Sequence, residues 1–254
     1  MTSPRRVQEQ PAYILHHRPF RDTSQLLDII SRDHGKLALV ARGSRGARSR
    51  LRGILRPFQA LRLSWFIRSD LGTLTGAEVD AAPVSLTGDA LLSAYYVNEL
   101  VLNFLHRHDA QPEIFDAYTR TITALASSVE IAANLRVFEI ELLRLLGYAL
   151  NLDFDAATHQ PLDAREYYEY RVEQGPMQVE RNTGPMVFGG DVLSAIGSAR
   201  FDDPKILLAA GRLLREVISY HLDGKELNTR KVLRDLHRVS IAQESRRTGR
   251  KKPE

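Results

Sequence analysis

The sequence has no cysteine among its 254 residues and only one tryptophan. Without cysteine there can be no disulfide bond, thiol nucleophile, iron–sulfur cluster or thiolate-bound zinc. The sequence also lacks a signal-peptide pattern and any uncharged apolar run of the ~18 residues that a membrane span needs. Its hydrophobic content of 43% is enough for a buried core, so we expect a soluble, cytoplasmic protein with no membrane partner.

Recognisable catalytic motifs are also missing. We find no GxxxxGK[ST] phosphate loop, no GxGxxG pattern and no GxSxG nucleophile elbow. His106 and His108 could chelate a metal with Asp109, but they are predicted to end a helix, where the helix dipole favours histidine. We therefore predict a protein that is not an enzyme and that has no cofactor and no metal. An enzyme that acts on an acidic substrate is the weakest alternative.

Positive charge is concentrated at the two ends of the chain. The net charge of +4 divides into +10 for residues 1–68, −10 for residues 69–245 and +4 for residues 246–254. Arginine dominates the first of these parts, and its planar guanidinium suits phosphate contacts. This distribution predicts that the N-terminal part faces a polyanion. The residues predicted to contact this polyanion, which the family resemblance described below implies to be DNA, are Lys36, Arg42, Arg45, Arg48, Arg50, Arg52, Arg56 and Arg62.

Residues 61–67 alternate between apolar and polar side chains, as in a strand with one buried face. The alternation predicts that Trp65 lies in the core. It places Phe58 and Phe66 on the other face, together with Arg62 and Arg68. Aromatic rings beside cations can hold a single nucleic-acid strand without reading its bases. The alternative for both phenylalanines is packing against the helical domain.

Short strands are predicted first and helices later, which gives an α+β fold class. Gly and Pro separate five β-prone runs, and a three-helix bundle and further helices follow residue 83. The predicted strands are 13–16, 26–30, 36–40, 61–67 and 73–79, with a small pair at 168–172 and 177–180. The predicted helices are 89–106, 113–127, 130–146, 191–196, 203–221 and 225–237. The expected units are a five-stranded barrel (1–82), a helical domain (83–150), an irregular region (151–190), C-terminal helices (191–240) and a basic disordered tail (241–254).

Several segments together resemble the bacterial recombination-mediator family RecO. Each motif is short, but they occur in the order of the family and extend from the first predicted strand to about residue 235. The basic VARGSR run, for example, is similar to the family's VAKGAR loop. The segments are 18–24 (RPFRDTS), 40–45 (VARGSR), 55–58 (LRPF), 96–100 (YVNEL), 135–139 (LRVFE), 146–148 (LGY) and 224–227 (GKEL) with Arg230.

The resemblance implies an oligonucleotide-binding (OB) barrel that binds single- and double-stranded DNA. It also implies annealing of complementary strands and assistance to RecA, indirectly, on DNA coated by single-strand binding protein, with RecR as partner, at the nucleoid. Family members often hold zinc through four cysteines in the region that matches 152–200. This chain has only His159 there, so we predict no zinc.

Arg136 is assigned a role by the resemblance alone. The family implies that the acidic, apolar-ended tail of single-strand binding protein docks near this residue, and the alternative is an ordinary surface arginine. Lys225, Arg230 and Lys231 could extend the DNA path, although a solvated helix surface explains them as well. Because OB barrels also bind RNA, an RNA-binding module is the second functional hypothesis.

Overall fold

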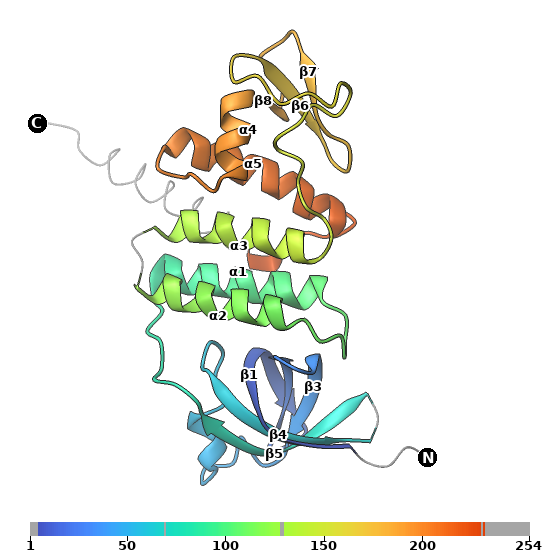
Figure 1. Cartoon of the computed structure of the whole chain (residues 1–254). Coiled ribbons are helices and arrows are strands. Elements are labelled where there is room, and N and C mark those ends of the chain that lie inside the picture. Colours follow the sequence, from blue (N-terminus) through green and yellow to red (C-terminus); the bar gives the residue numbers. More distant parts are fainter. Residues whose placement is uncertain (1–4, 69, 128–129, 230, 232–254) are drawn as a thin grey trace, which may run out of the picture.

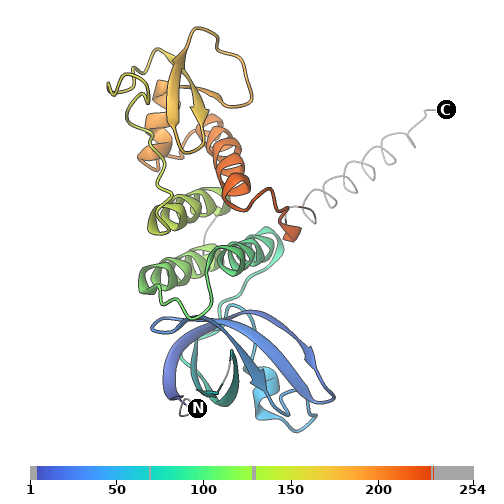
Figure 2. The ribbon, with the colours of Figure 1, turned by 90° about the vertical axis from the view of Figure 1, so that its right-hand side faces the viewer.

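The structure, a computed structural model, describes residues 5–68, 70–127, 130–229 and 231. A β-barrel forms one end of an elongated molecule, helices fill the middle, and a small sheet lies at the other end (Figures 1 and 2). In the described residues, no helix is long and apolar enough to cross a membrane.

The barrel closes in the order β1-β2-β3-β5-β4, and β4 pairs back onto β1. This is a closed five-stranded barrel of the OB type, as predicted from the sequence. Its interior is a separate core of aliphatic side chains around Trp65, which is 0% exposed. The strands are β1 (Arg5–Phe20), β2 (Ser24–Ser31), β3 (Gly35–Ala41), β4 (Leu61–Ile67) and β5 (Leu71–Val79).

Strand β1 is much longer than the predicted run at 13–16. Its first half pairs with β4 and its second half with β2, and the register shifts between Val7 and Gln10 and again between Ile14 and His16. These irregularities break the alternation that would reveal a strand in the sequence. Pro11, which lacks an N–H, still contributes its carbonyl, which accepts the Arg32 N–H at 3.1 Å.

Helices α1 to α3 follow the barrel and form the middle of the molecule together with α5 (Figure 1). The predicted boundaries agree with the observed ones to within a few residues. Asp203 caps α5, as its position before a proline suggests, and its side chain accepts the Lys205 N–H at 2.8 Å. The helices are α1 (Gly88–Phe104), α2 (Pro112–Ser127), α3 (Ile131–Leu145), α4 (Gly190–Gly197) and α5 (Pro204–His221).

The helix predicted at 225–237 begins later than expected. Residues 225–227 are irregular, while residues 228, 229 and 231 are helical. The remainder of that prediction, with Arg230 and the tail at 241–254, lies outside the described residues.

The barrel and the helices share apolar packing. Tyr13, Leu15 and Phe58 of the barrel belong to the same buried cluster as the helices. Phe58 is 7% exposed, and its ring lies 5.0 Å from that of Tyr95. The prediction that Phe58 faces solvent is therefore wrong, and the alternative of packing against the helices is confirmed.

The region predicted to be irregular, residues 151–190, contains a three-stranded sheet in the order β7-β6-β8. The predicted strand pair is confirmed, whereas the third strand was missed because it has only three residues. The region does not fit a zinc ion, because residues 152–200 include one histidine and no cysteine. Within the described residues, no three His, Asp or Glu side chains gather as metal ligands. The strands are β6 (Tyr167–Arg171), β7 (Gly175–Val179) and β8 (Val187–Gly189).

Asp155 organises this region. Its carboxylate is 4% exposed and accepts N–H groups from Ala157 at 2.8 Å, Thr158 at 2.7 Å and Gln178 at 2.8 Å, and the Thr158 hydroxyl at 3.1 Å. One side chain therefore ties the turn after residue 155 to strand β7.

Candidate nucleic-acid interface and partner cleft

The basic loop between β3 and β4 lies on the side of the barrel away from the helical layers (Figures 1 and 2). It is a series of turns followed by a short 3₁₀ helix, Arg50–Gly53. Six arginines of the loop are exposed, and none of them forms an ion pair with any residue the structure describes. They are Arg42, Arg45, Arg48, Arg50, Arg52 and Arg56.

The β1–β2 turn is attached to this loop through Arg45. The Arg45 N–H donates to the Thr23 carbonyl at 2.8 Å, and Arg45 Nη1 lies 3.5 Å from the Arg21 carbonyl oxygen and 3.4 Å from that of Asp22. Arg45 therefore holds the turn and the loop together, so the cations of the two segments lie on one surface.

This attachment adds Arg18 and Arg21, which sequence reasoning missed. Both are exposed, and neither has an ion pair within the described chain. The Arg21 guanidinium lies 5.4 Å from the centroid of the Phe20 ring. The available signal was a turn between two strands, which brings residues 18–23 beside the end of β3, where the basic loop begins.

Strand register defines the outer face of β1, β2 and β3. Leu27 and Leu39 point into the barrel core, so their neighbours point outward. Arg18, Leu26 and Val40 stand side by side in one row of that face. A small apolar cluster of Leu26, Ala38 and Val40, with Phe20 packed against it, lies on this face beside Arg18. OB barrels bind oligonucleotides on the face of strands 2 and 3 and on the loops between strands 1 and 2 and between strands 4 and 5, and the β1–β2 turn is the first of these loops.

The face of β4 carries less free charge than predicted. The Arg62 Nε lies 2.8 Å from an Asp80 oxygen, and Arg62 is also paired in register with Glu78. Phe66 is half-buried, with the Arg68 guanidinium 5.6 Å from the centroid of its ring. An arginine already paired with a carboxylate has less to gain from a phosphate, so this face is the weaker candidate.

Lys36 joins the barrel to the helices. Its Nζ donates to the Leu102 carbonyl of α1 at 2.6 Å. Burial lowers the pKa of Lys36, and the nearby positive charges of Arg107 and Lys225 lower it further. The structure therefore separates Lys36 from the basic loop, which lies at the opposite end of β3.

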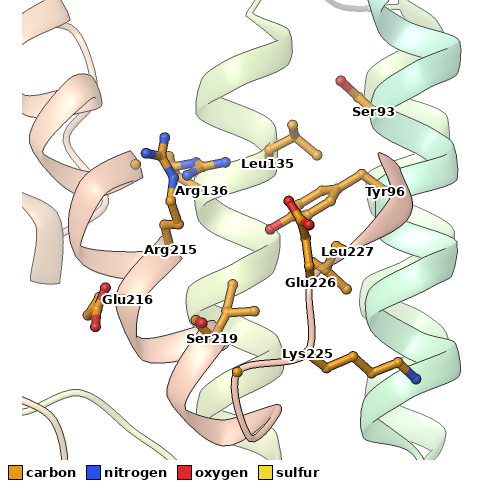
Figure 3. A pocket seen from close by; sticks show the side chains of 13 residues that line it. Ser93, Tyr96, Leu135, Arg136, Arg215, Glu216, Ser219, Lys225, Glu226 and Leu227 are labelled. Carbon is orange, nitrogen blue, oxygen red and sulfur yellow. The ribbon is translucent and has the colours of Figure 1, made fainter. Parts of the chain in front are cut away.

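Arg136 lines a cleft of about 510 Å³ between α1, α3, α5 and the chain after α5 (Figure 3). Its Nη2 lies 3.0 Å from Oε1 of Glu139, which is 0% exposed and also accepts the Tyr96 hydroxyl. A Cβ at Gly211 of α5 would lie 3.3 Å from Arg136 Nη1, so the glycine leaves room for the guanidinium. Arg215 and Lys225 also line the cleft.

The cleft combines cations with apolar surface. Leu135, Ile218 and Leu227 line it together with these three basic residues and two acidic ones, Glu216 and Glu226. Such a site suits a peptide that has both a carboxylate and an apolar side chain.

Comparison with known proteins finds two matching family models, described as "Recombination protein O N terminal" over residues 6–82 and "Recombination protein O C terminal" over residues 85–231. The chain is 39% identical over 238 residues to "DNA repair protein RecO" of Dechloromonas aromatica (strain RCB), covering 92% of this chain and 98% of that protein. Over 235 residues it is 39% identical to the protein of that name from Nitrosococcus oceani, covering 92% and 96%. The identity to that of Aromatoleum aromaticum is 37% over 240 residues, covering 94% and 100%. The chain belongs to the RecO family of DNA repair proteins.

Proposed function

We propose that this protein binds single- and double-stranded DNA, anneals complementary strands and assists the loading of RecA on DNA coated by single-strand binding protein, with RecR as partner. The observation that carries the proposal is the group of arginines, without ion pairs in the described part of the chain, that the β1–β2 turn and the basic loop present beside an apolar cluster on an OB barrel. This role would place the protein at the nucleoid.

The DNA contacts we propose are the exposed cations of this surface. Arg42, Arg48, Arg50, Arg52 and Arg56 come from the sequence prediction, and the structure adds Arg18 and Arg21. Arg45 contributes charge and also holds the turn. Lys36 and Arg62 are weaker candidates, because Leu102 and Asp80 already bind them.

The annealing step follows from electrostatics. Two DNA strands repel each other through their phosphates, and a surface rich in arginine lowers that repulsion by neutralising phosphates, while release of the condensed counterions drives the binding. No covalent bond is made or broken in annealing, so the proposed function needs no catalytic residue or cofactor.

We expect the protein to accelerate annealing of complementary strands that have been coated beforehand with single-strand binding protein. The measurement is the change in fluorescence of a donor–acceptor pair on the two strands, with and without the protein. An unchanged annealing rate would contradict the proposal. Competition between DNA and RNA strands of the same sequence separates the proposed function from RNA binding, which a preference for RNA would favour.

Arg136 is proposed to bind the acidic tail of single-strand binding protein. We expect Arg136→Glu to weaken binding of a peptide with that tail sequence at least tenfold, or about 1.4 kcal/mol, because it reverses the charge that faces a carboxylate. Binding of naked DNA is expected to be unchanged, because α3 and α5, which carry Arg136 and Arg215 of the cleft, lie on the far side of α1 and α2 from the barrel (Figure 1). Fluorescence anisotropy of labelled peptide and labelled DNA measures both.

Arg144→Glu is the matched control, since Arg144 is exposed in the last turn of α3 and outside the cleft. Because Arg136→Glu also places a second acid beside Glu139, Arg136→Gln serves as a milder variant. Equal loss of peptide and DNA binding in both Arg136 variants would count against the assignment.

A further inference from the structure

One turn of α1 connects three separate parts of the molecule. The Tyr96 hydroxyl donates to Glu139 of α3, beside Arg136. Asn98 Nδ2 donates to the Leu15 carbonyl of β1 at 2.7 Å, and Asn98 Oδ1 accepts the Tyr118 hydroxyl at 2.7 Å. Glu99 extends from the same turn toward the chain that follows α5.

The Glu99 carboxylate accepts four hydrogen bonds from two consecutive residues. Oε1 accepts the Asn228 backbone N–H at 2.7 Å and its Nδ2 at 3.0 Å, and Oε2 accepts the Thr229 N–H at 2.9 Å and its hydroxyl at 2.6 Å. A carboxylate that receives four donors at these distances makes short, charge-assisted bonds. Glu99 therefore fixes the far end of residues 224–229, which we name the strap.

The strap forms one wall of the partner cleft. Gly224, Lys225, Glu226 and Leu227 all line it, opposite Leu135 and Arg136 of α3 (Figure 3). The Gly224 N–H donates to the Ser219 carbonyl at 2.8 Å, which holds the near end of the strap on α5. Leu227 is 2% exposed in the helical core. Lys225 and Glu226 are exposed, and the Lys225 N–H donates to the Leu222 carbonyl at 2.9 Å, so Glu99 holds the end of the strap that is remote from α5.

We propose that Glu99 is a positioning residue of the partner cleft, which holds the strap in place as the wall that an acidic peptide needs for docking. This inference rests on the proposed function of the cleft. Glu99 itself does not line the cleft, so its effect on a peptide would pass through the strap. A strap that is docked only part of the time would leave Arg136 in place but remove Lys225 and Leu227 from the site. The apparent affinity for a peptide falls in proportion to the fraction of molecules that have the complete cleft.

The first test compares Glu99→Gln with wild type, using a fluorescent peptide of acidic residues that ends in an apolar residue with a free carboxylate. Glutamine keeps the length of the side chain but removes the charge and turns an NH₂ group toward N–H and O–H donors. We expect peptide binding to weaken by about tenfold, as it would if the strap were docked in about a tenth of the molecules. DNA binding should not change.

Asp89→Asn is the matched control, because Asp89 lies in the first turn of α1 and does not line the cleft. The emission of Trp65, which is fully buried in the barrel core, reports that the barrel remains folded. Thr229→Val removes one of the four donors. Added to Glu99→Gln it should weaken peptide binding no further, because both variants break the same contact.

A spin label measures the strap without any peptide. Because the chain has no cysteine, Lys225→Cys gives a single labelling site on the strap. We expect a broad, immobilised spectrum in the otherwise wild-type chain and a sharper one when Glu99→Gln is added. A merely structural role in global stability would not sharpen the spectrum of a folded protein.

The outcomes separate the two proposals. If wild type does not bind the peptide, the proposed function of the cleft fails and this inference fails with it. If wild type binds and Glu99→Gln binds equally well, or if the strap spectrum does not change, the role of Glu99 alone is overturned.

Discussion

Replacing Arg18, Arg21 and Arg42 together by alanine is expected to weaken binding of single-stranded DNA by about a hundredfold at 0.1 M salt, because each lost phosphate contact with a slope of ~0.7 costs about fivefold. All three side chains are exposed, and no described residue forms an ion pair with them. Arg18 is paired in register with Leu26 of the apolar cluster, the Arg21 guanidinium lies 5.4 Å from the centroid of the Phe20 ring, and Arg42 directly follows β3. These three cations therefore adjoin the apolar cluster and are available to a polyanion.

The salt dependence gives this prediction a second readout. The slope of log K against log salt should become less negative by about 2 in the triple variant, since three phosphate contacts are lost. Titrations of a labelled oligonucleotide at several salt concentrations measure the affinity and the slope together. A variant that lost affinity through misfolding would change the emission of buried Trp65 as well.

Arg62→Ala is the matched control on the same barrel. Its guanidinium is bound to Asp80 at 2.8 Å, so little free charge is removed. We expect DNA affinity to fall less than about twofold, as for a surface charge that is already paired. A large loss in Arg62→Ala with little change in the triple variant would place the DNA on the β4 face instead.

The contrast between these two faces shows what sequence periodicity can resolve. Alternation in residues 61–67 correctly separates Trp65 from outward-facing Arg62. It carries no information about Asp80, which is brought beside Arg62 by the pairing of β4 with β5. Whether a cation is free or paired depends on contacts between strands, and a single strand pattern does not contain them.

Two other features also depend on contacts between segments that are distant in sequence. Arg18 and Arg21 join the basic loop because a hairpin turn folds back on it. Arg45, whose side chain bonds to the Arg21 carbonyl, follows Arg21 by 24 residues. The wall of the partner cleft comes from α1, α3, α5 and the strap. Arg136 was identified through resemblance to a family, since no local pattern distinguishes it from other helical arginines. Elements with strong local signals, such as the helix capped by Asp203, were predicted closely.

The second large effect is expected for a substitution of Asp155, and it is an effect on stability. Asp155→Asn should lower the free energy of unfolding of the C-terminal sheet by about 2 kcal/mol, the scale of charge-assisted hydrogen bonds lost on a buried acceptor. Both oxygens of Asp155 accept hydrogen bonds from the backbone, and the amide of asparagine has only one acceptor. Amide hydrogen exchange at Gln178, whose N–H donates to Asp155, measures the effect locally, and thermal unfolding measures it globally.

The effect should depend on pH in a defined direction. Burial raises the pKa of Asp155, but hydrogen bonds from Thr158, Gln178 and Ala157 outweigh it, and the pKa in the folded protein is below the ordinary value. A carboxyl group with a lowered folded pKa contributes stability above its unfolded pKa of ~3.9, and this contribution disappears as the pH falls through the folded value. The difference between wild type and Asp155→Asn should therefore be full at neutral pH and shrink in acid.

Asp153→Asn is the control, because Asp153 lies two residues away and is exposed. A metal chelator should leave the unfolding of wild type unchanged, since the tie between the turn and β7 is a carboxylate and not a metal ion. An unfolding midpoint lowered by the chelator, or an equal effect of Asp153→Asn and Asp155→Asn, would contradict this account. Asp155 can hold the turn and the strand together because it is one buried centre that repays its desolvation with several short hydrogen bonds.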